Sequence, residues 1–180
     1  MQLFRRILTV LACALFYYLA FSLNKFIFDK YDFSFGVDWV FVPSGLQLVL
    51  VLTAVEDAAL GITIASWLIG FLYYPLESDI RTMITGVITG ISPLLARNFS
   101  FNYLKIEADL RNLSFQAIVQ MSFIFSFLSA ALHQLWFYYN GVSDKFISSL
   151  LVMAIGNVLG TLVVLSVIKL AIAAVKRNAQ

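Results

Sequence analysis

Residues 39–52 read WVFVPSGLQLVLVL, in which Pro43, Ser44 and Gly45 separate an aromatic lead-in from a long apolar run. Proline suits the first turn of a helix, because the amide that it lacks would be unpaired there anyway. The stretch therefore predicts irregular backbone at residues 39–42, followed by a helix. Gln47 lies one turn inside this helix. Its amide would be costly against lipid, so we expect it to face protein.

The composition of the whole chain is that of an integral membrane protein. Hydrophobic residues make up 61% of its 180 residues and charged residues only 12%, and the mean hydropathy is +0.90. A soluble protein of this size needs more charged surface than 12 basic and 10 acidic side chains supply. A net charge of +2, with no basic patch, argues against nucleic-acid binding. The apolar stretches are therefore expected to face membrane lipid or one another.

Six apolar stretches approach the roughly 20 residues that a helix needs to cross a bilayer. They lie at residues 7–23, 39–55, 58–74, 80–96, 114–138 and 146–175. Helices are expected because a bilayer offers backbone amides no water, and because the strict alternation of membrane strands is absent. The sequence predicts an all-α, polytopic membrane bundle of about six transmembrane helices, which forms a single domain over residues 1–180.

The basic residues predict the orientation, since cytoplasmic loops retain more Lys and Arg than translocated ones. With both termini cytoplasmic, the inner side collects eight of the 12 basic residues: Arg5, Arg6, Arg97, Lys105, Arg111, Lys169, Lys176 and Arg177. We therefore expect a multi-pass protein of the cell inner (cytoplasmic) membrane. The outer loop at residues 24–38 mixes aromatic and charged residues, and it is expected to lie along the membrane surface.

No set of residues predicts catalysis, a cofactor or a metal ion. The single histidine, His133, is expected to be an interfacial hydrogen bonder at the outer end of the fifth span. The single cysteine, Cys13, lies within the first span and cannot form an intramolecular disulfide. We expect the protein not to be an enzyme.

Neutral polar side chains at membrane depth are the remaining candidates for function. Gln47, Gln120 and Asn157 should face the bundle interior, where they either join helices or line a ligand pocket. A helix that starts at Pro43 would also present free amides and a positive dipole end to a small polar or anionic ligand. The candidate ligand-binding residues are Pro43, Gly45, Gln47 and Asn157.

Two pairs of glycines are spaced four residues apart, Gly86 with Gly90 and Gly156 with Gly160. Such pairs make a flat helix face that a second backbone can approach closely. They predict helix packing, either within one chain or in a homo-oligomer.

The phrases FVPSGLQLVLVL and ALGITIASWLIG, at residues 41–52 and 59–70, resemble the opening of the bacterial membrane-associated sensor domain family. These integral sensory modules are often fused to histidine kinases or diguanylate cyclases. The phrase LLVMAIGNVLGTLVVLSVIKL, at residues 150–170, is similar to the last span of that family, with Asn157 where Asp is frequent. Family members usually have about eight spans and a cytoplasmic output domain. This sequence predicts six spans and shows no output domain, so the resemblance implies that the protein signals through a separate protein partner.

Three functions remain open on the sequence. The resemblance implies a sensor-like module that binds a small ligand or a partner protein. A substrate-binding subunit of a vitamin uptake system also has about six spans, but the first span lacks the Ala-xxx-Ala face by which such subunits dock. A structural accessory subunit of a larger membrane complex is the third.

Overall fold

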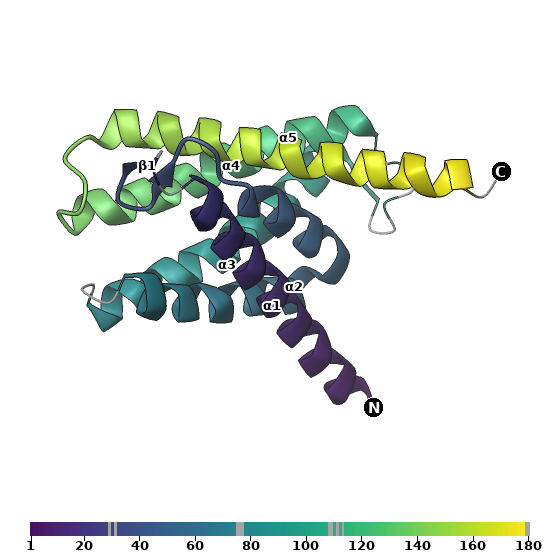
Figure 1. Ribbon diagram of the computed structural model, residues 1–180, viewed down its shortest axis with the longest axis horizontal. Coiled ribbons are helices and arrows are strands. Elements are labelled where there is room, and N and C mark those ends of the chain that lie inside the picture. The colour runs from purple at the N-terminus through teal and green to yellow at the C-terminus, as the bar shows by residue number, and fades with distance from the viewer. Residues whose placement is uncertain are drawn as a thin grey trace.

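The computed structural model describes residues 1–28, 30, 32–74, 78–107, 110, 112 and 114–178, and the side chains as far as residue 171 (Figure 1). The described elements are helices and one small hairpin. They are α1 (Gln2–Phe28), β1 (Asp32–Ser34), β2 (Val37–Asp38), α2 (Pro43–Tyr73), α3 (Asp79–Leu104), α4 (Phe115–Tyr139) and α5 (Phe146–Asn178). The two strands pair antiparallel, so the all-helical expectation is met apart from this hairpin.

The helices have the length and surface of membrane spans. Among the described residues, four helices are long and apolar enough to cross a bilayer: α1, α2, α4 and α5. The outer face of α1 exposes large apolar side chains along its length, among them Leu8, Leu11, Leu15 and Leu19. Exposed apolar surface on this scale is suited to lipid rather than water. The chain is therefore a helical membrane protein.

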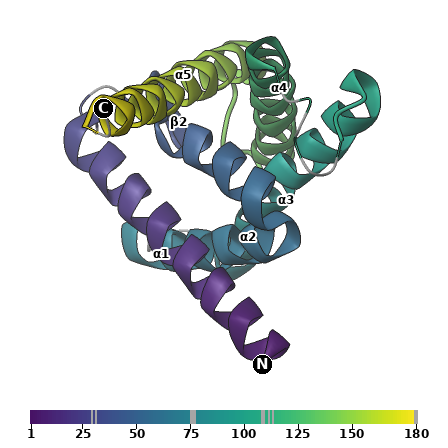
Figure 2. The same ribbon diagram turned by 90° about the vertical axis from the view of Figure 1, so that its right-hand side faces the viewer.

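The structure does not show the six separate helical spans that the sequence predicted, because two of the predicted spans lie in one kinked helix. The ranges 39–55 and 58–74 both fall in α2, which contains a non-helical residue, Val55 (φ 42°, ψ −112°). Figure 2 shows the ribbon changing direction sharply between the arm at 43–54 and the arm at 56–73. The first arm is only about 18 Å long, which is less than the hydrocarbon thickness. The fourth predicted span lies in α3, which is not among the four strongly apolar helices.

Two apolar clusters hold α2 at the centre of the bundle. One joins α1 to α2 through residues such as Tyr17, Phe21 and Ile62, and the other joins α2, α3 and α4 through residues such as Leu48 and Phe125. The glycines of α3 allow a close approach to the second arm of α2. A Cβ on Gly86 would lie 2.3 Å from the Trp67 ring, and a Cβ on Gly90 would lie 2.5 Å from the Ala59 carbonyl oxygen.

The glycine pair of α5 packs against extended chain rather than against another helix. A Cβ on Gly156 would lie 2.2 Å from the Asp38 carbonyl oxygen, and one on Gly160 would lie 1.8 Å from the Phe41 carbonyl oxygen. The Phe41 amide donates a hydrogen bond to the Gly156 carbonyl oxygen (3.1 Å). The segment between β2 and α2 therefore lies against α5, and the Phe41 and Val42 amides within it are hydrogen-bonded to protein, as an apolar environment requires.

Candidate functional site: a polar cavity inside the helical bundle

A cavity of about 120 Å³ lies inside the bundle, and all five helices and the hairpin contribute to its walls. Its volume exceeds the roughly 15 Å³ that one water molecule requires, so it has room for several waters or a small molecule. Aromatic rings form part of the wall, and one carboxylate and one guanidinium, those of Asp38 and Arg81, also line it. The cavity is thus a partly enclosed space whose wall is mostly apolar and carries several polar groups.

Helix α3 supplies a polar wall through residues that share one face. Arg81, Thr82, Thr85 and Thr89 all line the cavity, and their spacing places them along one side of the helix. This wall runs about 12 Å from Arg81 to Thr89, since a helix rises 1.5 Å per residue. The least apolar helix of the sequence is therefore the one that lines the cavity with hydroxyl groups.

His133 is buried in the interior of the bundle, on the cavity wall. Its Nδ1 lies 2.8 Å from the Ser129 carbonyl oxygen, and its Nε2 lies 3.1 Å from the Thr89 hydroxyl. A carbonyl only accepts, so Nδ1 carries a proton and a neutral ring leaves Nε2 to accept from Thr89. The Thr89 hydroxyl also lies 2.8 Å from the Thr85 carbonyl oxygen, which is an alternative acceptor. His133 thus joins α4 to α3 on the cavity wall.

Two buried amides that the sequence singled out, Gln47 and Asn157, line the same cavity from different helices. Their exposed fractions are 3% and 2%. The Tyr17 hydroxyl lies beside Gln47 and Ser66. Within the described part of the chain, the side-chain amide of Asn157 makes no hydrogen bond. Because a buried amide without a partner is costly, this group favours a hydrogen-bonding occupant of the cavity.

The other two candidate residues, Pro43 and Gly45, do not line the cavity. The Ser44 and Gly45 amides already donate to the carbonyl oxygens of Phe41 (3.1 Å) and Val42 (3.2 Å). Gly45 instead packs on α5, where its Cβ would lie 2.8 Å from the Thr161 Cα. The Ser44 and Gly45 amides, which were expected to face a ligand, are therefore already hydrogen-bonded. Pro43 and Gly45 help to place α2 against α5, but they do not contact the cavity.

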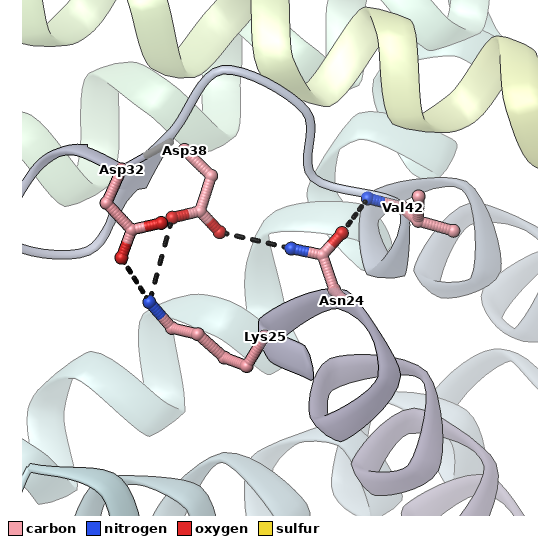
Figure 3. A network of polar contacts seen from close by, with 5 residues as sticks. All are labelled: Asn24, Lys25, Asp32, Asp38 and Val42. Carbon is pink, nitrogen blue, oxygen red and sulfur yellow. Dashed lines mark hydrogen bonds and ion pairs between the residues drawn. The ribbon is translucent and has the colours of Figure 1, made fainter. Parts of the chain in front are cut away.

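A network of charged and amide groups joins the end of α1 to the hairpin (Figure 3). Lys25 forms an ion pair with Asp32, and its Nζ lies 4.0 Å from Asp38 Oδ1. The Asn24 amide nitrogen donates to Asp38 Oδ2 (3.3 Å), while its amide oxygen accepts from the Val42 backbone amide (3.0 Å). Asn24 therefore bonds both Asp38, where the segment between β2 and α2 begins, and Val42, where it ends. Through these bonds, residues 32–38 of the predicted outer loop are held over the cavity instead of lying along the membrane surface.

Several residues of the site were not singled out from the sequence. Asn24, Lys25, Asp38 and Arg81 lie at the ends of apolar stretches, where polar residues normally face water. Asn24 and Asp38 could have been proposed from their position in the sequence, because each is directly adjacent to a predicted span. No group of three or more His, Cys, Asp and Glu side chains suited to a metal ion occurs among the residues that the structure describes.

Comparison of the chain with protein-family models, with curated proteins and with solved structures finds no match. The fold and the cavity define its class: a helical membrane protein with a partly enclosed interior cavity that several polar side chains line.

Proposed function

We propose that this chain is an integral membrane binding module of sensor type, which holds a small polar molecule in the cavity and signals through a separate protein partner. The observation that carries the proposal is the buried Asn157 amide, which faces a polar cavity and has no hydrogen-bond partner in the described chain. Ligand sites in proteins combine an apolar wall with a few convergent polar groups, and this cavity has both. The resemblance of residues 41–52 and 150–170 to bacterial membrane sensor domains supports the signalling role.

The polar groups deep in the cavity favour an uncharged part of a ligand. Gln47, Asn157, Thr89 and Ser129 are neutral donors and acceptors. The charged Asp38 lies within the Lys25 and Asn24 network, so its charge is largely balanced by protein. A molecule with amide, hydroxyl or ring-nitrogen groups matches such a lining better than a free ion does.

We further propose that the chain crosses the inner membrane six times with both termini cytoplasmic. The second crossing is composite: the first arm of α2 is about 18 Å long, and the irregular residues 39–42 before it lengthen the crossing toward a hydrocarbon core of about 30 Å. The start of α1 and the end of α5 both lie on the right-hand side of Figure 1. The excess of basic residues on that side supports its cytoplasmic assignment.

The experiment that tests ligand binding compares the molecules that purified variants retain. Wild-type protein, Gln47→Leu and Asn157→Leu would be purified in mild detergent and denatured, and the released small molecules measured by mass spectrometry. Gln134→Leu is the matched control, because Gln134 is a fully buried amide that does not line the cavity. We expect wild type and Gln134→Leu to release the same molecule, and Gln47→Leu and Asn157→Leu to release at least tenfold less. Equal release from all four proteins, or release of nothing by wild type, would contradict the proposal.

An uptake subunit is the second candidate, because an interior cavity with several polar groups in a small membrane protein suits a carrier equally well. Copurification with ATPase subunits would favour it, whereas copurification with a kinase or cyclase would favour the sensor. The unpartnered Asn157 amide counts against a purely structural accessory subunit, in which the polar groups would be expected to pair with one another.

A further inference from the structure

The hairpin formed by β1 and β2 reaches across one end of the cavity. Its turn residues, Phe35 and Gly36, both line the cavity wall. The Phe35 ring contacts Tyr74, which follows α2, at a centroid distance of 5.1 Å, and Phe137 on α4 at 5.9 Å. Gly36 adopts φ +64°, and a Cβ there would lie 3.3 Å from the Phe137 ring. The turn thus extends from the α1 side of the bundle to its α4 side.

The base of this hairpin is held differently from its tip. At the base, Lys25 pairs with Asp32, and Asn24 bonds both Asp38 and the Val42 amide. At the tip, the contacts are between aromatic rings, and Phe35 remains 38% exposed. Ring contacts are individually weak, and a two-stranded hairpin has little stability of its own. Detachment of the tip would therefore leave the base attached to α1.

We propose that the β1–β2 hairpin is a lid, with Phe35 as its latch, and that a small polar ligand reaches the cavity by passing under it. This inference deepens the proposed function and rests on it, since it names the route to the same cavity. The route lies at the end of the bundle where α2 ends and α3 begins, because Tyr74 and Arg81 line the cavity there. Opening requires the Phe35 ring to leave its contacts with Tyr74 and Phe137 and the turn at Gly36 to move away from the Phe137 ring, while β2 stays packed on α5 through the buried Val37 and Asp38.

The test measures how fast a thiol inside the cavity reacts with a water-soluble reagent. Cys13, the single native cysteine, is replaced by Ala, and Ser66→Cys serves as the reporter, since the Ser66 hydroxyl is fully buried at the cavity wall. The probe is methanethiosulfonate ethyltrimethylammonium, applied to the full chain in detergent. We expect Phe35→Ala to raise the rate of modification at position 66 at least tenfold. Phe33→Ala is the matched control, because Phe33 packs on Trp39 (5.6 Å) within the same segment, and it should change the rate less than twofold.

A cross-link supplies the opposite perturbation. Phe35→Cys combined with Phe137→Cys should form a disulfide on oxidation, and modification of position 66, read by peptide mass spectrometry, should then slow at least tenfold and recover on reduction. Three results would overturn the lid: unchanged rates in Phe35→Ala, equal acceleration by Phe33→Ala, or a cross-linked protein in which position 66 is modified as fast as in the reduced protein. If the cavity has no natural ligand, the extraction experiment releases nothing, but the modification rates at position 66 are unaffected. Failure of the proposed function and failure of the lid can therefore be told apart.

Discussion

The carbonyl oxygen of Phe41 lies against Gly160, where any other residue would carry its Cβ. A Cβ at this position would be 1.8 Å from that oxygen and 2.7 Å from the Val42 nitrogen. Both atoms belong to the backbone, so they cannot move aside as the end of a flexible side chain would. Because residue 160 is glycine, the segment of residues 39–42 can lie directly against α5. This packing places Asp38 and Asn157 on the wall of the same cavity.

Gly160→Ala should lower the free energy of unfolding by about 1–3 kcal/mol, because the added methyl group forces α5 and the extended segment apart. Thermal unfolding in detergent measures this change. Leu159→Ala is the control, since Leu159 is the neighbouring residue and is 41% exposed on the lipid-facing side of α5. If the two variants unfolded at the same temperature, the close contact between Phe41 and Gly160 would be of no energetic importance.

Asn24→Ala should also destabilise the protein, because it leaves the Val42 amide and one Asp38 oxygen without their shared partner. Buried polar groups that lose a partner cost about 1–3 kcal/mol each, although measured values in membrane proteins tend toward the lower end. We expect a loss of about 1–3 kcal/mol in unfolding free energy, measured in detergent. Asn98→Ala is the matched control, because the Asn98 side chain is exposed and accepts a hydrogen bond from the neighbouring Arg97. A loss of equal size in both variants would contradict the role of Asn24.

The apolar stretches predicted the helices and their approximate positions because helix formation in a membrane depends on length and hydropathy, which are local properties. The kink at Val55 was not predicted as such. The sequence did place a tight turn near Glu56 and Asp57, but a turn made by one valine at positive φ has no local signature, since glycine is the usual residue there.

The cavity was predicted only in part. Gln47 and Asn157 were found because an amide within an apolar run stands out, and both line the cavity. Asp38, Arg81 and Asn24 were missed because residues at the end of a span normally face water. Their inward position depends on the hairpin folding back over the bundle, which is a tertiary arrangement that hydropathy does not encode.

Lys25→Gln should loosen the hairpin, because it removes the partner of Asp32 and leaves the buried Asp38 with less compensating charge. We expect a tenfold or greater increase in the rate at which protease cleaves within residues 28–38, measured by mass spectrometry of the fragments. Arg6→Gln is the control: Arg6 pairs with Asp57, but their side chains are 62% and 19% exposed, and exposed pairs contribute only about 0–1 kcal/mol. Equal cleavage of the two variants would show that the Lys25 pair does not hold the hairpin.

The composite second crossing makes a prediction about which side of the membrane each turn occupies. Single cysteines would be placed at the exposed positions Glu56, Asn102 and Ser148 in a Cys13→Ala background. If residues 39–42 and the first arm of α2 together cross the bilayer, Glu56 and Asn102 lie on the cytoplasmic side and Ser148 on the outer side. A membrane-impermeant maleimide applied to intact cells should then modify only Ser148→Cys, and modify all three after permeabilisation. Modification of Glu56→Cys in intact cells would mean that the short arm does not carry the chain across, and that the two arms of α2 enter and leave from one face.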